Sequence, residues 1–253
     1  MVKIEHLKVQ FNDLVVLKDI NLHIKEGEVV AVIGPSGTGK STLLRCLNYL
    51  VHPVKGKITI DGCSLEAETA NKKDIYNFRR KTAMVFQNYN LFKNMTALQN
   101  IMEPMVVVQK KNKKEAEEIA KSLLKQVGLE EKASSYPSEL SGGQQQRVGI
   151  ARAMASSAKV ILFDEPTSSL DPELVGEVLN VIKKLAELHN TTMIIVTHEM
   201  KFAQNVADRV IFLEDGMVLS DGSPEDVIGN KSNERIRKFV NTITGDFKSG
   251  EEI

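Results

Sequence analysis

A glycine-rich loop between an apolar segment and a helix constrains this chain more than any other feature. Residues 34–41 read Gly-Pro-Ser-Gly-Thr-Gly-Lys-Ser and match the phosphate-binding pattern G-x-x-x-x-G-K-[ST]. The preceding run, residues 28–33, is nearly all apolar, which is typical of a strand buried on both faces of a sheet. The glycines let successive backbone N–H groups point into one anion-binding concavity, and the helix N-terminus adds positive partial charge. The sequence therefore predicts a strand–loop–helix unit that holds nucleotide phosphates.

Within this loop we expect both side chains and backbone to contact the phosphates of a nucleotide. Lys40 is expected to reach the β- and γ-phosphates, and the Ser41 hydroxyl to bind Mg²⁺. The candidate ATP-binding residues of the loop are Ser36, Gly37, Thr38, Gly39, Lys40, Ser41 and Thr42.

The rest of the chain alternates strand-like and helix-like segments around a helical middle, which predicts the α/β class. We expect strands at 2–10, 15–24, 28–33, 56–61, 82–87, 159–164, 192–197, 209–214 and 217–220. We expect helices at about 39–50, 113–127, 141–157, 172–188, 199–207 and 232–243, with a short one after Ser223.

This order of elements predicts one domain over residues 1–243. Its core, about 1–87 and 158–243, would hold a mixed sheet with antiparallel N-terminal strands, and residues 88–157 would form an inserted helical subdomain. Residues 244–253 read as a polar tail.

A second apolar segment ends in two acidic residues. Residues 160–163 read Val-Ile-Leu-Phe, and Asp164 and Glu165 follow. A carboxylate at the C-terminal edge of a parallel strand lies in the ligand crevice of such a sheet. We therefore expect Asp164 to hold Mg²⁺ and Glu165 to polarise the water that attacks the γ-phosphate.

Composition narrows the possible partners. Thirty-three basic residues balance thirty-three acidic ones, which argues against nucleic acid as the main partner. No apolar run approaches the ~20 residues that a membrane-spanning helix needs, and the N-terminus does not resemble a signal peptide. We expect a soluble cytoplasmic protein, for which any membrane role would come through a partner. The cysteines, Cys46 and Cys63, have no metal-type spacing and are expected to be small apolar residues.

The segment Leu140-Ser-Gly-Gly-Gln144 resembles the signature sequence of the ABC (ATP-binding cassette) ATPases. Further residues resemble that family's landmarks, in the family's order along the chain. They are the adenine-stacking aromatic Phe11, the Q-loop glutamine Gln87, the D-loop Ser169-Leu170-Asp171 and the switch histidine His198. The resemblance implies a P-loop NTPase core of the ABC ATPase type.

The resemblance also implies roles for these residues. Gln87 and His198 would sense or position the γ-phosphate, and Gln87 would also approach Mg²⁺. Phe11 would stack on adenine, although Val16 or a neighbouring face could equally do so. In this family the signature faces the γ-phosphate held by a second subunit, so two ATP molecules lie inside a head-to-tail homodimer. That adds Ser141, Gly142, Gly143, Gln144 and Asp171 to the candidate ATP-binding residues, and makes Lys40, Gln87, Glu165 and His198 the candidate catalytic set.

Nearly the whole chain, about 2–243, is similar to ATPases of polar amino-acid importers. The stretches that carry this narrower resemblance are 84–92, 96–100, 140–153, 162–172 and 197–203. It implies integral membrane permease partners, an extracellular solute-binding protein acting indirectly, and a peripheral place on the cytoplasmic face of the membrane. Lys93 and Asn94 depart from the family's usual Pro-His in the region expected to meet the permease.

Three other functions compete with this interpretation. The first is an ABC ATPase that serves a different substrate or an exporter. The second is a non-transport ABC ATPase, but chromosome-type members place a long coiled coil between the phosphate loop and the signature. Here Lys40 and Ser141 are only 141 − 40 = 101 residues apart, without sustained heptads. The third is a non-catalytic nucleotide-binding regulator. The presence of both Glu165 and His198 argues against this function.

Overall fold

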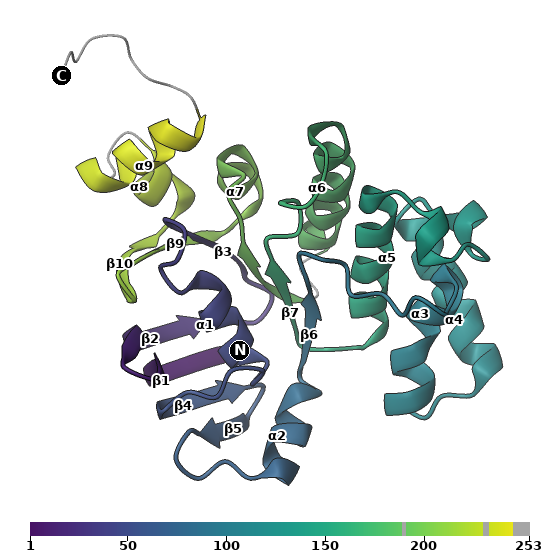
Figure 1. The fold of residues 1–253 in the computed structure, drawn as a ribbon, viewed down its shortest axis with the longest axis horizontal. Coiled ribbons are helices and arrows are strands. Elements are labelled where there is room, and N and C mark those ends of the chain that lie inside the picture. The colour runs from purple at the N-terminus through teal and green to yellow at the C-terminus, as the bar shows by residue number, and fades with distance from the viewer. Residues whose placement is uncertain (189–190, 230–232, 245–253) are drawn as a thin grey trace.

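The structure, a computed structural model, describes residues 1–188, 191–229 and 233–244 (Figure 1). Within these residues a six-stranded sheet has the order β10-β9-β3-β8-β7-β6. Its strands β9, β3, β8, β7 and β6 run parallel, and β10 pairs antiparallel with β9. The strands are β3 (Val29–Ile33), β6 (Thr82–Val85), β7 (Val160–Asp164), β8 (Thr192–Val196), β9 (Arg209–Glu214) and β10 (Met217–Gly222).

The three central strands of this sheet are buried on both faces. Every residue of β3, β7 and β8 is buried. Their near-continuous apolar sequences explain this position, because helices cover both faces of a parallel sheet and leave no solvated side for polar residues. Three of the strands that hold the site are therefore wholly buried.

A second, antiparallel sheet stands beside the first. It has the order β2-β1-β4-β5 and consists of β1 (Val2–Phe11), β2 (Leu14–Ile24), β4 (Lys55–Ile60) and β5 (Cys63–Glu66). Helix α1 (Lys40–Leu47) lies between the two sheets, as Figure 1 shows. Apolar side chains of α1 and of both sheets form one core cluster there, which fixes the helix that follows the glycine-rich loop.

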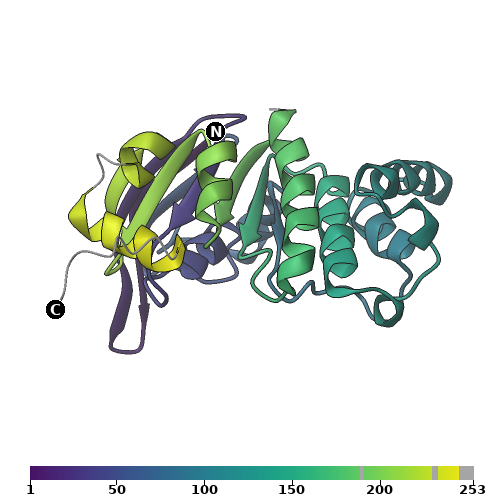
Figure 2. The same ribbon diagram turned by 90° about the horizontal axis from the view of Figure 1, so that it is seen from above.

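Helices cover the opposite face of the six-stranded sheet. Helix α6 (Pro172–Glu187) packs on β7 and β8 through Val178 and Ile182, and α7 (Met200–Val206) follows β8. The short helix α8 (Pro224–Ile228) and α9 (Glu234–Thr244) close the end near β9 through a smaller core cluster. Figure 2 shows these C-terminal helices at one end of an elongated molecule.

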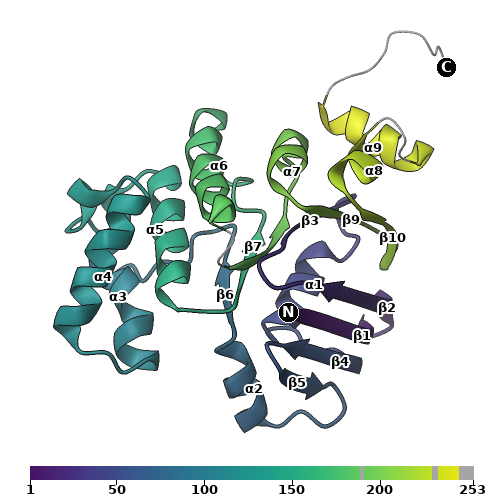
Figure 3. The same ribbon diagram turned by 180° about the vertical axis from the view of Figure 1, so that it is seen from behind.

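The helical middle of the chain forms the other end (Figure 3). It contains α3 (Ala97–Glu103), a π-helical turn (Pro104–Val108), α4 (Lys113–Gln126), 3₁₀ turns at Glu130–Lys132 and Pro137–Glu139, and α5 (Gly142–Ala155). These elements bury a core of their own, to which α4 contributes Ala116, Ala120 and Leu124 at helical spacing. The side of α5 turned to the sheet packs on β6 and α6.

The observed elements follow the predicted order, with differences at particular places. Helix α1 ends at Leu47 rather than near residue 50, because Tyr49 takes a left-handed backbone conformation with φ 54°. Strand β5 and helix α2 (Lys72–Arg79) were not predicted, since each buries a single side chain and shows no apolar period. The predicted start of the last helix at 232 and the polar tail from 245 lie outside the described residues.

Among residues 1–188, 191–229 and 233–244, no helix has the length and apolar character that a membrane span requires.

Candidate active site

The candidate catalytic residues follow the carboxyl ends of four adjacent strands. The order β3-β8-β7-β6 places the glycine-rich loop, His198, the pair Asp164 and Glu165, and Gln87 in a row along one edge of the sheet. The register supports this: Asp164 pairs with Val196, and the amide of Thr197 donates to the carbonyl of Val32 at 3.3 Å. Ligands of open α/β sheets bind outside this edge.

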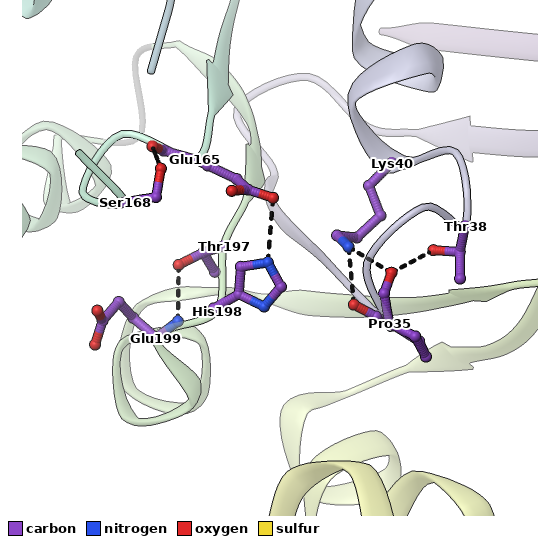
Figure 4. A network of polar contacts seen from close by, with 9 residues as sticks. Pro35, Thr38, Lys40, Glu165, Ser168, Thr197, His198 and Glu199 are labelled. Atoms are coloured by element: carbon purple, nitrogen blue, oxygen red, sulfur yellow. Dashed lines mark hydrogen bonds and ion pairs between the residues drawn. The ribbon is translucent and has the colours of Figure 1, made fainter. Parts of the chain in front are cut away.

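The loop folds around the ammonium group of Lys40. Lys40 Nζ donates to the carbonyls of Gly34 and Pro35, both at 2.8 Å, and Thr38 Oγ1 donates to the carbonyl of Pro35 at 2.9 Å (Figure 4). Only 5% of Lys40 is exposed. Burial lowers the pKa of Lys40, while the nearby Glu165 and Asp164 carboxylates oppose that shift. The ammonium is therefore confined at the centre of the loop.

Gly34 is needed where the loop leaves β3. Its φ is +144°, and an added Cβ would lie 2.1 Å from the backbone oxygen of Leu213 on β9. A side chain there would push the loop away from the sheet.

The two carboxylates that follow β7 have different surroundings. Asp164 is only 4% exposed, and Arg45 Nη2 of α1 donates to its Oδ2 at 3.2 Å. Glu165 Oε1 accepts a hydrogen bond from His198 Nε2 at 3.1 Å (Figure 4). The His198 hydrogen bond is the largest effect lowering the Glu165 pKa, followed by the charges of His198 and Lys40, and it outweighs the effect of burial. Glu165 is thus ionised at neutral pH, as a base must be.

The donor set fits a magnesium ion. Mg²⁺ prefers oxygen ligands, keeps several waters, and is commonly bound by one or two carboxylates together with substrate phosphates. Asp164 supplies a buried carboxylate at the strand edge, and Ser41 supplies a hydroxyl in the first turn of α1. The ion pair of Arg45 with Asp164 shows that this carboxylate accepts a cationic partner.

The proposed adenine contacts lie on the antiparallel sheet. Val16 packs against the glycine-rich loop, because an added Cβ at Gly39 would lie 3.3 Å from Val16 Cγ1. Phe11 pairs with Leu14 at the end of the β1–β2 hairpin, and the two side chains are 48% and 67% exposed. The structure therefore brings Val16 to the loop and leaves Phe11 accessible on the hairpin.

The signature residues form the start of α5. Ser141 Oγ accepts from the amide of Gln144 at 3.3 Å, and Gln144 Oε1 accepts from the amide of Ser141 at 3.0 Å, which makes a capping box. Gly142 and Gly143 follow as the first helical residues. Figure 1 shows α5 and α1 on opposite sides of β6 and β7, so the structure does not bring the signature to the phosphate loop of the same chain. Asp171 lies at the N-cap of α6 without a side-chain cap bond.

Three residues that contact this site were not predicted from the sequence. Arg45 pairs with Asp164, Tyr89 donates to the carbonyl of Ser169, and Arg152 donates to the carbonyls of Tyr89 and Asn90. No motif marks them, since each acts through a contact between segments distant in the sequence. Arg45 alone could have been suspected from the sequence, because it lies one helical turn after Ser41, on the helix that follows the phosphate loop.

A phosphate loop, a buried strand-end aspartate and a glutamate paired with a histidine define this protein as a P-loop ATPase. The chain belongs to the ABC transporter family, since the family model described as ABC transporter matches residues 17–168. It is an ATP-hydrolysing subunit of this family, with the ABC ATPase fold.

The comparisons with individual proteins agree with this assignment. The chain is 57% identical over 243 residues to the "Probable amino-acid import ATP-binding protein YxeO" of Bacillus subtilis (strain 168), covering 96% of this chain and 97% of that protein. It is 51% identical to the "L-cystine import ATP-binding protein TcyC" of the same organism, covering 96% and 98%.

Solved structures show the same fold. The dimeric ATP-binding cassette MJ0796 bound to ADP and Pi matches with a TM-score of 0.78 and 36% identity, covering 88% of this chain and 99% of that one. CbiO1 from Clostridium perfringens matches with a TM-score of 0.81 and 33% identity, covering 95% and 94%.

Proposed function

We propose that this chain energises the uptake of amino acids by an ABC importer, and that it acts as a homodimer enclosing two ATP molecules. The observation that carries the catalytic part is the row of Lys40, His198, Glu165 and Gln87 along one sheet edge, with Glu165 and His198 already hydrogen-bonded. The amino-acid substrate is supported by the names of relatives at 46% identity or more, which include amino-acid, L-cystine, glutamine and arginine transport.

Hydrolysis needs a water activated beside the γ-phosphate and donors that neutralise the charge developing on it. Glu165 accepts the proton of that water, and His198 holds the Glu165 carboxylate in place and senses the γ-phosphate. Lys40 exchanges its two backbone carbonyl partners for phosphate oxygens, and Gln87 positions the phosphate from the next strand. Magnesium, held by Asp164 and Ser41 with Gln87 nearby, supplies charge neutralisation when bound.

The remaining donors come from a second copy of the chain. The N–H groups at the start of α5 have no intrahelical partner, and Ser141 satisfies only part of them. Such a helix end binds anions, but α5 lies away from its own phosphate loop. A head-to-tail pair brings each α5 N-terminus to the γ-phosphate of the other chain, and the dimeric MJ0796 cassette with ADP and Pi supports this arrangement.

The permease partner has a suitable surface on the helical side. An open, mostly apolar groove of about 460 Å³ lies between β6 and the helical segment, and its lining includes Phe92, Val107, Val108 and Arg152. Phe92, Val107 and Val108 are 40–49% exposed. An apolar groove of this kind suits a short helix of a membrane protein. Binding there would hold the chain on the cytoplasmic face of the membrane, with the solute-binding protein acting from outside through the permease.

We also infer that residues 1–243 work as one ABC ATPase domain in which 88–157 form an inserted helical subdomain. The separate buried core of α3, α4 and α5 supports this boundary.

Two experiments test the proposal. The tagged chain is first purified with its native membranes, and co-purifying proteins are identified by mass spectrometry. We expect a polytopic membrane protein accompanied by a solute-binding protein; recovery of soluble or nucleic-acid partners alone would contradict the transport role. Uptake of labelled amino acids by cells with Lys40→Ala in place of the native chain is then measured. Loss of uptake of one or a few amino acids is expected, and unchanged uptake of all of them would contradict amino-acid import.

A further inference from the structure

The segment that follows Gln87 is fastened to the loop between β7 and α6. Tyr89 Oη donates to the backbone carbonyl of Ser169 at 3.2 Å. The residue before Tyr89 is also bonded to this loop, because the Ser169 hydroxyl donates to Asn88 Oδ1 at 3.4 Å. These bonds join residues 80 and 81 positions apart, so two loops at the candidate active site are held in one mutual arrangement.

The same tyrosine contacts the start of α5. A Cβ added at Gly142 would lie 2.6 Å from Tyr89 Oη and 3.4 Å from its Cζ. The phenol therefore rests directly on the first residue of the helix, in the space that any side chain at Gly142 would occupy. The hydroxyl of Tyr89 thus lies between Ser169 and the signature.

Arg152 fixes the segment from its other side. Its Nη1 donates to the carbonyl of Asn90 at 2.7 Å and its Nη2 to the carbonyl of Tyr89 at 3.1 Å. The guanidinium carbon lies 5.8 Å from the centre of the Phe92 ring. Tyr89 and Asn90 both have left-handed backbones, with φ 57° and 49°, which persist only where surrounding contacts hold them. The position of the Tyr89 ring is therefore imposed by its surroundings.

We propose that Tyr89 is a positioning residue that couples the two ATP sites of the dimer. The inference rests on the proposed function, in which Gln87 contacts the ATP of its own chain and the start of α5 contacts the ATP of the partner chain. Tyr89 lies two residues after Gln87 and touches Gly142 at the start of α5. A shift of Gln87 on phosphate binding is passed through Tyr89 to Gly142, and so to the other ATP. This identifies the two sites and the contact between them that allostery requires.

The test compares Tyr89→Phe with wild type in the full-length chain. The ATPase rate is measured against ATP concentration, which gives a Hill coefficient that can reach the number of sites in the dimer. Tyr89→Phe keeps the ring and removes only the hydroxyl. The loss of one neutral hydrogen bond changes an equilibrium about fivefold, so we expect the coupling factor between sites to fall about fivefold. The Hill coefficient should approach 1 while the maximal rate changes less than about threefold.

Two further variants keep the result interpretable. Tyr76→Phe, on the exposed side of α2, is the matched control and should leave the Hill coefficient unchanged. Ser169→Ala removes the bond from the Ser169 hydroxyl to Asn88 and keeps the backbone carbonyl that accepts from Tyr89. It should lower the coefficient as well, non-additively with Tyr89→Phe, because the two bonds join the same two loops. The thermal midpoint of unfolding is measured for each variant. If Tyr89→Phe lowers that midpoint strongly, the result for Ser169→Ala decides the test.

Three results would overturn parts of the account. A cooperative wild type with an unchanged coefficient in Tyr89→Phe and Ser169→Ala would refute the coupling role alone. A wild type that hydrolyses ATP with a coefficient of 1 would also refute it, since there would be no coupling to carry. A wild type that binds and hydrolyses no ATP would refute the proposed function itself.

Discussion

The sheet edge that holds the phosphate loop and the helical segment that carries the signature are built in opposite ways. Around the phosphate loop the central strands are wholly buried, and Lys40, Asp164 and Glu165 already have hydrogen-bonding partners. In the helical segment, Ser141 and the groove-lining Val107 and Val108 are exposed. The contacts at the sheet edge form within a single chain, whereas the helical segment presents exposed groups that the proposed function assigns to a second chain and a permease.

In the proposed dimer, this contrast combines firm binding of ATP with switching. Buried strands whose polar groups are already hydrogen-bonded hold the reacting atoms at fixed positions, and stabilisation of developing charge requires fixed positions. In the proposed dimer, the start of α5 engages and releases the nucleotide of the partner chain, so its contacts follow the state of that nucleotide. We therefore expect the two halves to respond differently to substitution.

The largest expected effect is the loss of the proposed base, Glu165, from the sheet edge. Glu165→Gln keeps the shape of the side chain but cannot take a proton, and general-base catalysis contributes about 100- to 10,000-fold. We expect a loss of ATPase rate in this range, measured by phosphate release, with ATP binding retained. Ser168→Ala, which removes a hydroxyl bonded to the backbone of Glu165, is the control and should change the rate less than about tenfold. A Glu165→Gln enzyme that is as fast as wild type would refute the assignment of the base.

Thiol reactivity tests the rigidity of the phosphate-loop half. Burial raises the pKa of Cys46, on the inner face of α1, to about 12, whereas Cys63 is partly exposed on β5. Each unit of pKa lowers the thiolate fraction about tenfold, so the rise from 9.0 to about 12 lowers the thiolate fraction of Cys46 about 1000-fold at pH 8. Buried Cys46 should therefore react far more slowly with a thiol reagent than the partly exposed Cys63. Mass spectrometry of native and urea-unfolded protein measures this. Equal rates in the native protein would show that the core opens easily.

Asn100 tests the helical half. It is fully buried, its Nδ2 donates to the carbonyls of Phe92, Met95 and Thr96, and its Oδ1 accepts from the amide of Phe92. Asn100→Ala leaves several buried groups unpaired, so we expect a loss of about 3 kcal/mol in the free energy of unfolding. Urea denaturation measures it.

Asn112→Ala serves as the matched control for Asn100→Ala. Asn112 caps α4 with one side-chain bond, and its loss should cost about 1 kcal/mol. ATP binding should survive both substitutions if the phosphate-loop half is independent. Loss of ATP binding in Asn100→Ala at a temperature where the chain is folded would contradict the separation of the two halves.

The smallest expected effect concerns the ionisation of Glu165. His198 is the main cause of its lowered pKa, so His198→Ala should raise the Glu165 pKa towards 4.5. A carboxyl group whose pKa is lowered by folding stabilises the native state above pH 4.5, and that contribution disappears as the pH falls through the folded-state pKa. Carbon-13 NMR of labelled glutamate follows the titration in both proteins. An unchanged Glu165 pKa in the variant would refute the pairing.

Much of the fold and of the candidate site is predictable from the sequence, for a physical reason. Buried parallel strands such as β3 and β7 need continuous apolar runs, and an anion-binding loop needs glycines, so both leave local patterns. The capping box at Ser141 is also visible in the residues themselves. Strand β5 and helix α2 leave little pattern, because each has only one buried residue.

Contacts between distant segments could not be predicted. The ion pair of Arg45 with Asp164 and the contacts of Tyr89 with Ser169 and Gly142 depend on how elements pack, and neighbouring residues in the sequence do not encode them. The exposed position of Phe11 is likewise set by the hairpin rather than by its apolar character. The strand-end and loop residues of the sheet edge can therefore be predicted from the sequence. The residues that connect this edge to the helical segment, such as Tyr89, cannot.

The most direct test of a site shared between two chains is complementation between two inactive variants. Lys40→Ala disables the phosphate loop, and Ser141→Arg blocks the α5 N-terminus, so each variant alone should lack ATPase activity. Random pairing makes half of the dimers mixed. Each mixed dimer has one site that combines an intact phosphate loop with an intact α5 N-terminus, so about a quarter of all sites are restored. The account predicts that mixing the purified variants recovers ATP hydrolysis. A mixture that stays inactive while cross-linking shows mixed dimers, or full activity of Ser141→Arg alone, would contradict it.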